Sequence, residues 1–355
     1  MKSYHIAVIA GDGIGREVMP EGLHVLETAG RMFDFTCTWE HFDWSCEAYQ
    51  QTGRMMPVDG LDRLRSFDAI FLGAVGYPGV PDHISLWGLL IPIRRAFHQY
   101  VNLRPARLLE GVKSPLANQR SGEIDLMIVR ENNEGEYSDV GGRLFVGTEE
   151  EMAVQQATFT RRGCDRVMRY AFELARRRRH HVTSATKSNG IIYSMPFWDE
   201  RFASMSAQYA DCHADRYHID ILAAHFVRHP EWFDVVVGSN LFGDILSDLS
   251  AAVVGSIGIA PSANLNPERL YPSMFEPVHG SAPDIAGKGI ANPIAQIWSG
   301  AMMLDHLGEP AAARAIEKAF SSVLAQHGPR TADLGGSSTT QEVGESIAAQ
   351  LTAGA

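Results

Sequence analysis

Two aspartates four residues apart are the clearest candidates for chemistry in this chain of 355 residues. Asp244 and Asp248 follow an apolar run in GSNLFGDILSDLS, and their spacing places both carboxylates on one face of a helix. Like charges in that arrangement repel, so either both carboxylates lie in solvent or a cation neutralises them. Apolar neighbours predict that the helix is partly buried. The pattern therefore favours a hard divalent cation, with a solvated acidic face as the alternative.

Three arginines lie at borders between apolar segments and loops: Arg94, Arg104 and Arg130. A guanidinium is a planar fork that can hold a carboxylate through two hydrogen bonds. Taken singly, each is better explained as a surface arginine beside an acidic residue. Lys187 in TSATKSNG and Tyr137 in ENNEGEYS are also ordinary when each is considered alone.

Two glycine-rich stretches are candidates for nucleotide binding. Gly11, Gly13 and Gly15 lie between a predicted strand and a predicted helix, but their G-x-G-x-G spacing differs from the Rossmann G-x-G-x-x-G, so a plain turn is the alternative. The irregular stretch FEPVHGSAPDIAGKGIANP at 275–293 has backbone N–H groups suited to a phosphate and an adenine. A structural loop between helices is its alternative.

The elements that must position these residues alternate between strands and helices, which predicts an α/β layer fold. The predicted strands are 5–10, 68–75, 124–130 and 234–239, and the predicted helices are 15–29, 164–179 and 309–327. A further helix is expected after Thr339, because Thr339 and Glu342 have the spacing of a capping box. The run RRRRHH at 176–181 is interpreted as the solvated end of a helix, without a function.

Composition excludes several classes of protein. A formal net charge of −11 has the wrong sign for a dedicated nucleic-acid or anionic-membrane binder. No apolar run reaches the length of about 18 residues that a membrane helix needs. Four scattered cysteines without a C-x-x-C pair indicate free thiols and no zinc site. The N-terminus reads as a strand entering a glycine turn, which predicts a cytoplasmic protein.

Four motifs, in this order, carry a resemblance over nearly the whole chain: VRENNEGEYS, SATKSNG, VVVGSNLFGDILSDL and FEPVHGSAPDIAGKGIANP. Together they resemble the β-decarboxylating 2-hydroxyacid dehydrogenases, the family of isopropylmalate, isocitrate, tartrate and D-malate dehydrogenases. The resemblance implies an isopropylmalate-dehydrogenase-like α/β fold with a large mixed sheet, which is not a Rossmann fold. It implies a cofactor-side domain from residues 1–99 and 255–355, and a domain from 100–254 with the substrate, metal and dimer-interface residues. An obligate homodimer with shared active sites is also implied.

The resemblance also implies a role for each candidate residue. The substrate, a small dicarboxylate, would be bound by Arg94, Arg104, Arg130, Trp87 and Asn189. Mg²⁺ or Mn²⁺ would be bound by Asp244, Asp248 and the neighbouring subunit's Asp220. Lys187, also expected from the neighbouring subunit, would help remove the hydroxyl proton, and Tyr137 would protonate the carbon that loses CO₂.

The cofactor is expected to be NAD, because Asp284 stands where NADP-using relatives have a lysine. A carboxylate accepts hydrogen bonds from the ribose 2′-hydroxyl and repels a 2′-phosphate. The other expected cofactor contacts are Glu276, His279, Gly280, Ser281, Ala282 and Asn292. Some relatives also need a monovalent cation such as K⁺, and the sequence leaves this requirement open.

Within the family, the segments 81–105 and 184–202 look like the tartrate/D-malate branch. Trp87 stands near the expected position of the C3 substituent, where an indole leaves little room for an isopropyl group. A 3-isopropylmalate dehydrogenase is the nearest alternative, and a catalytically silent regulatory homologue is another. The complete set of catalytic and metal residues argues against the silent homologue. Asn133, where threonine is common, leaves the fine substrate preference open.

Overall fold

Contacts divide the chain into two units in this computed structural model, which describes residues 2–354. The first unit comprises Met1–Gln99, Leu103–Asp125 and Ser250–Ala355, and the second comprises Tyr100–Asn102 and Leu126–Leu249. The sequence analysis placed residues 103–125 and 250–254 with the middle of the chain, whereas their contacts group them with both chain ends. Within residues 2–354, no helix is long and apolar enough to cross a membrane.

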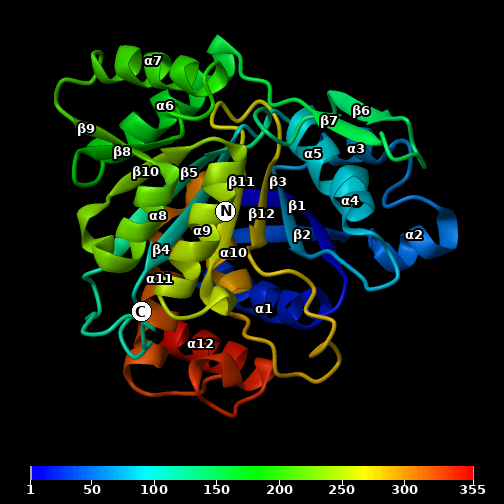
Figure 1. Cartoon of the computed structure of the whole chain (residues 1–355). Coiled ribbons are helices and arrows are strands. Elements are labelled where there is room, and N and C mark those ends of the chain that lie inside the picture. Colours follow the sequence, from blue (N-terminus) through cyan, green and yellow to red (C-terminus); the bar gives the residue numbers. More distant parts are fainter. Residues whose placement is uncertain (1, 355) are drawn as a thin grey trace. The chain divides into compact units, whose positions relative to one another are not determined.

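The first unit packs helices against a group of parallel strands. Its elements are β1 (Lys2–Gly11), α1 (Gly15–Phe33), β2 (Phe35–His41), α2 (Cys46–Thr52), α3 (Gly60–Leu64), β3 (Ala69–Ala74), α4 (Asp82–Ser85), the π-helical turn η1 (Leu86–Leu90), α5 (Ile91–Ala96), η3 (Ile257–Ile259), β11 (Pro261–Leu265), β12 (Ser273–Pro277), α10 (Ile294–Leu307), α11 (Pro310–Ala325), η4 (Ala332–Leu334) and α12 (Thr340–Ala353). Helices α1, α10, α11 and α12 pack together (Figure 1). The predicted capping box of Thr339 and Glu342 is confirmed at the start of α12.

The second unit holds a group of parallel strands and a separate hairpin. Its elements are β6 (Gly141–Leu144), β7 (Met152–Gln155), α6 (Arg161–Arg176), β8 (His181–Thr186), α7 (Ser194–Ser206), β9 (His213–His218), α8 (Ile219–Arg228), η2 (Pro230–Trp232) and β10 (Val235–Gly238). Three further elements cross the sequence boundaries of the units: β4 (Val101–Arg107), β5 (Asp125–Glu131) and α9 (Asn240–Val253). Strands β6 and β7 form an antiparallel pair in which every residue is exposed.

Ten strands form one mixed sheet in the order β2-β1-β3-β12-β11-β4-β5-β10-β8-β9. The pairs of β1 with β2 and β3 are parallel, as are those of β8 with β9 and β10, whereas β11 and β12 are antiparallel. This large mixed sheet confirms the predicted α/β fold. The apolar runs explain the arrangement, since residues 6–9 of β1 and 235–237 of β10 are completely buried.

The arginine run at 176–181 is less solvated than the sequence indicated. Helix α6 ends at Arg176, and the Nε atom of Arg178 donates to Oδ1 of Asp234 at 2.7 Å. The backbone N–H of Arg179 donates to the other oxygen of Asp234 at 2.8 Å. Because Asp234 is 1% exposed, the run neutralises a buried carboxylate.

Candidate active site

Arg130, Asp244 and Tyr137 form a cluster in the second unit. Arg130, the last residue but one of β5, is 2% exposed and forms an ion pair with Oδ1 of Asp244 in α9. The Tyr137 hydroxyl donates to the other oxygen of Asp244 at 2.8 Å, and the Arg130 guanidinium lies 5.3 Å from the Tyr137 ring centre. A guanidinium able to bind a carboxylate, a carboxylate able to bind a metal ion and a phenol able to donate a proton therefore meet in one place.

Asn240 fixes the orientation of Arg130, although the sequence analysis did not single it out. Its Oδ1 atom accepts from Nε of Arg130 at 3.0 Å and from a terminal nitrogen at 2.6 Å. Gly243 lies so close that an added Cβ would stand 2.6 Å from the Arg130 Cβ. The only sequence signal for these two residues is their position at the start of the helix that carries Asp244.

The carboxylates expected to bind metal do not all gather within one chain. Asp244 and Asp248 lie one turn apart on α9, and the side chain of Asp220 at the start of α8 is 66% exposed. Among the described residues, neither of the two three-ligand groups close enough to hold an ion includes these aspartates. Their oxygen donors suit Mg²⁺ or Mn²⁺, and a third carboxylate from a neighbouring subunit would complete such a set.

Lys187 and Asp220 form an ion pair with a Nζ–Oδ1 distance of 2.5 Å. Lys187 follows β8 and Asp220 follows the adjacent parallel strand β9, so both side chains lie at the same edge of the sheet. The hydrogen bond from Lys187 lowers the pKa of the Asp220 carboxyl. The two residues that the resemblance assigns to the neighbouring subunit are thus held together on one chain.

Asn189 is exposed and lines a cavity of about 290 Å³ in the second unit. Arg216 and His218, which sequence reasoning missed, line the same cavity. Both residues lie on β9, before Asp220. They are two residues apart on a strand, which places them on the same face, and this spacing was the sequence signal for the pair.

Glu131 positions the loop that carries Tyr137. Its carboxylate is 1% exposed and accepts the backbone N–H groups of Asn133 at 2.9 Å and Glu134 at 2.6 Å. Burial raises the pKa of Glu131 to about 7, against the opposing effect of these hydrogen bonds and of Arg166.

This shift predicts that Glu131 makes stability depend on pH. Between its ordinary value of 4.5 and about 7, the folded protein keeps a proton that the unfolded chain has released, so the free energy of unfolding falls as pH rises. One such group contributes a slope of up to about 1.4 kcal/mol per pH unit. Denaturant unfolding at several pH values should show a shallower slope for Glu131→Gln and an unchanged slope for the exposed control Glu150→Gln. Equal slopes for wild type and Glu131→Gln would contradict the prediction.

In the first unit, Arg94 is paired with Glu276 and both are buried. The Arg94 guanidinium donates to Oε1 of Glu276 at 2.8 Å, and the Asn264 amide donates to the same oxygen at 2.7 Å. The side chains of Arg94 and Glu276 are only 8% and 9% exposed, so Glu276 keeps Arg94 in its orientation. The expected contact of Glu276 with adenosine stays a prediction, and in the structure its carboxylate also positions Arg94. Arg104, on β4, is buried as well.

Trp87 lies in η1 and is half-buried. The Arg95 guanidinium stands over its indole ring at 4.9 Å from the ring centre. This contact fixes a large apolar side chain about two helical turns before Arg94.

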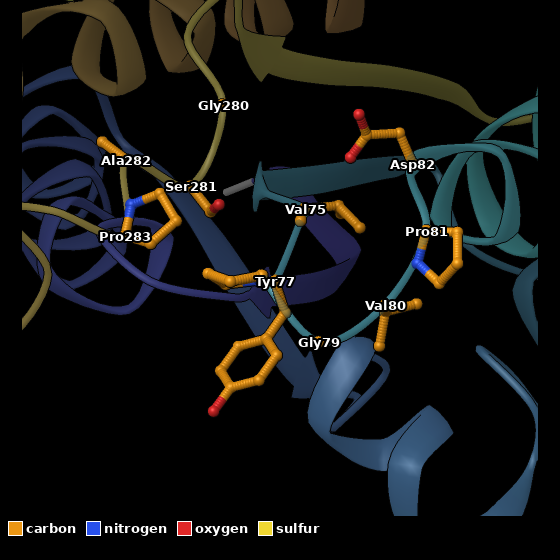
Figure 2. A pocket seen from close by; sticks show the side chains of 12 residues that line it. Val75, Tyr77, Gly79, Val80, Pro81, Asp82, Gly280, Ser281, Ala282 and Pro283 are labelled. Atoms are coloured by element: carbon orange, nitrogen blue, oxygen red, sulfur yellow. The ribbon is translucent and has the colours of Figure 1, made fainter.

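A cleft of about 690 Å³ lies between the segments 75–82 and 280–283 of the first unit (Figure 2). Gly280, Ser281 and Ala282, all expected at the cofactor, line it. The glycine turn holds one wall, since Ile14 N–H donates to the Ser281 carbonyl at 2.9 Å and a Cβ on Gly13 would stand 2.1 Å from that oxygen. Close approach of two backbones therefore explains this glycine.

Asp12, at the centre of the glycine turn, was missed by the sequence analysis. It is 1% exposed, and its carboxylate accepts the backbone N–H of Cys46 at 3.0 Å and of Gly76 at 3.1 Å. It thereby ties the turn to the segment that lines the cleft. The sequence signal for Asp12 was an acidic residue between two glycines of a tight turn.

The remaining expected cofactor residues differ in their surroundings. His279 is buried, burial lowers its pKa, and its Nε2 atom has no hydrogen-bond partner among the described residues. Such an orphaned neutral imidazole suits an adenine. Asn292 donates to Asp333 at 3.0 Å and accepts from the backbone N–H of Ile294, the first residue of α10. Asp284 is exposed, as a ligand for a ribose hydroxyl must be.

Comparisons with known proteins show the family and agree with the fold. The profile of the isocitrate/isopropylmalate dehydrogenase family matches residues 5–347. The chain is 59% identical to D-malate dehydrogenase [decarboxylating] of Escherichia coli (strain K12) and 56% identical to tartrate dehydrogenase/decarboxylase of Pseudomonas putida, over 98% of each chain. A crystal structure of isocitrate dehydrogenase from Methylococcus capsulatus superposes with a TM-score of 0.89 at 36% identity, covering 98% of this chain and 99% of that one.

Proposed function

Because the chain belongs to the isocitrate/isopropylmalate dehydrogenase family, whose members are oxidoreductases, we propose that it oxidises and decarboxylates a small 2-hydroxy diacid, D-malate or a tartrate, with NAD. The observation that carries the proposal is the joining of Arg130, Asp244 and Tyr137 in one cluster. The two relatives at 59% and 56% identity support the substrate class. The protein is proposed to work in the cytoplasm.

The residues of this chain divide the reaction between them. Arg94, Arg104 and Arg130 bind and orient the two substrate carboxylates. Gly280, Ser281 and Ala282 would hold NAD, which would supply a hydride acceptor, and Asp244, Asp248 and the neighbouring subunit's Asp220 would hold a divalent ion, which would supply Lewis acidity toward the substrate oxygens. The Lys187 amine helps remove the hydroxyl proton while the hydride leaves C2. The bond to the departing CO₂ then breaks, and the Tyr137 hydroxyl donates a proton to the carbon that carried it.

Two features support a homodimer with shared sites. The exposed β6–β7 hairpin carries apolar side chains such as Phe145 and Val146, at 62% and 66% exposure, and a lone two-stranded hairpin is marginally stable in water. Ile221 on α8 and Ile245 on α9 are 44% and 50% exposed, next to Asp220 and Asp244 respectively. Covering these side chains with a second copy brings apolar surface out of water beside the metal ligands.

A substrate panel tests the proposed function. With NAD and Mn²⁺, NADH should form with D-malate and at least one tartrate isomer far faster than with 3-isopropylmalate, because Trp87 leaves little room for an isopropyl group. Steady-state kcat/KM values for these substrates and isocitrate provide the measurement. Efficient turnover of 3-isopropylmalate would instead establish the isopropylmalate enzyme, and no turnover of any substrate would indicate the silent homologue.

Cofactor choice is predicted to depend on Asp284. Asp284→Lys with Ile285→Tyr should shift the ratio of kcat/KM for NAD over NADP by about 10- to 100-fold toward NADP, because a hydrogen bond to a charged group contributes about 1.5–3 kcal/mol. Ile285 packs partly against the buried Ile14 and Val18, so the single variants Asp284→Lys and Asp284→Asn separate the charge effect from packing. An unchanged ratio in all three variants would mean that the discrimination lies elsewhere.

A further inference from the structure

Two histidines and an aspartate gather on one face of β8 and β9, apart from the candidate active site. In the parallel pairing, His181 lies opposite His213 and Thr183 lies opposite Asp215. Side chains two residues apart on a strand point to the same face, so the register brings His181, His213 and Asp215 together. The histidines are 32 positions apart in the sequence, which hides the set from any motif search.

The ligand atoms of this set converge. Oδ2 of Asp215 lies 3.2 Å from Nε2 of His181 and 4.0 Å from Nε2 of His213, and the two imidazole centres are 4.8 Å apart. Zinc bonds of about 2.0–2.1 Å in tetrahedral geometry separate neighbouring ligand atoms by about 3.3 Å. The first distance already fits. The His213 side chain is 71% exposed and has room to rotate by the small amount that the second requires.

We propose that His181, His213 and Asp215 bind one divalent transition-metal ion of the zinc class. Imidazole nitrogens select such ions, whereas the all-carboxylate set of Asp220, Asp244 and Asp248 suits Mg²⁺ or Mn²⁺. Three protein ligands leave one position for water. The two sites therefore differ in ligand chemistry, and each selects a different metal.

The ion joins the last strand of the sheet to its neighbour. Strand β9 ends the strand order and pairs only with β8, so its other edge lacks a strand partner among the described strands. Lys187 and Asp220 follow these same two strands. An ion that binds only the folded protein stabilises it by mass action, so its occupancy raises the stability of the strand pair that leads to both residues.

The adjacent group of His180, Asp211 and Cys212 is a weaker candidate. Arg176 holds both oxygens of Asp211 at 2.8 Å, and burial raises the pKa of the Cys212 thiol. An ion there would have to displace an arginine and deprotonate a buried thiol. Among the described residues, Asp215 forms ion pairs with His181 and His213 and with no arginine or lysine.

Metal titration of the intact protein tests the proposal without measuring turnover. Chelator-stripped protein in excess Mg²⁺ is titrated with Zn²⁺ by calorimetry and with Co²⁺ by visible absorption, and thermal unfolding is followed with and without Zn²⁺. We expect one ion per chain, a raised Tm and a cobalt spectrum without thiolate charge transfer. His213→Gln and Asp215→Asn should weaken binding by more than about 100-fold, since even outer-shell partners contribute 10- to 100-fold.

Matched variants separate this set from its neighbours. His229→Gln removes a partly exposed histidine that stacks on Trp232, and Cys212→Ser removes the adjacent thiol; both should bind Zn²⁺ like the wild type. His213 is so exposed that His213→Gln leaves the fold intact. Wild-type affinity in His213→Gln, loss of binding in Cys212→Ser, or no Zn²⁺ binding in excess Mg²⁺ would each overturn the proposal.

Discussion

Mixing an inactive Lys187→Met chain with an inactive Asp244→Asn chain is expected to restore roughly a quarter of the wild-type activity, because half of the dimers at random exchange carry one intact site of two. Each variant alone should lose about 10²- to 10⁴-fold in hydride transfer, the range for removal of acid–base help. The restored site combines Lys187 of the Asn-bearing chain with Asp244 of the Met-bearing chain. The measurement is NADH formation after subunit exchange.

The burial of the affected charges indicates how each substitution acts on folding. Lys187 contacts Asp220, whose side chain is 66% exposed, so Lys187→Met leaves no buried charge unpaired and should fold normally. Asp244→Asn weakens the ion pair of the buried Arg130 and can lower stability. Asp248→Asn, on the same helix at an exposed position, is therefore a second complementing partner.

Two controls make the result decisive. A tag on one variant confirms that the subunits exchange, and the double variant Lys187→Met/Asp244→Asn mixed with the Lys187→Met chain gives the background. If tagged heterodimers form and neither Asp244→Asn nor Asp248→Asn restores activity with Lys187→Met, the assignment of Lys187 to a shared site is wrong.

Tyr137→Phe is expected to uncouple oxidation from decarboxylation. The phenylalanine keeps the ring beneath Arg130 but removes the hydroxyl that donates to Asp244, so proton delivery to the carbon should fall by about 10²- to 10⁴-fold. The oxidised β-keto diacid should then leave the enzyme. The ratio of NADH formed to CO₂ released, near one in the wild type, should rise well above one.

A matched control isolates the hydroxyl of Tyr137. Tyr193 belongs to the same unit and is 85% exposed, so Tyr193→Phe should keep the wild-type ratio. Because Tyr137 also touches Asp244, the Mn²⁺ concentration for half-maximal activity is measured for both variants. If Tyr137→Phe slows oxidation and decarboxylation equally and raises the Mn²⁺ concentration for half-maximal activity, the tyrosine acts only by positioning the metal ligand Asp244.

The sequence by itself determined the α/β class, the main helices and strands, and the family. Periodicity and capping are local properties, so the strands at 5–10 and 234–239 and the capping box of Thr339 are found where they were predicted. The spacing of Asp244 and Asp248 fixed their common helix face for the same reason. The motif order around Lys187, Tyr137 and Asp284 was sufficient to name the candidate residues.

Only the tertiary structure decided which side chains meet. The pairing of Glu276 with Arg94, 182 positions earlier in the chain, was not expected from the sequence. Asp12 and Asn240 gained their positioning roles from backbone groups and side chains distant in sequence. His181 and His213 face each other through strand register alone. Such contacts depend on the register of strand pairing and on which buried polar groups need hydrogen-bond partners. The local spacing of residues determines neither.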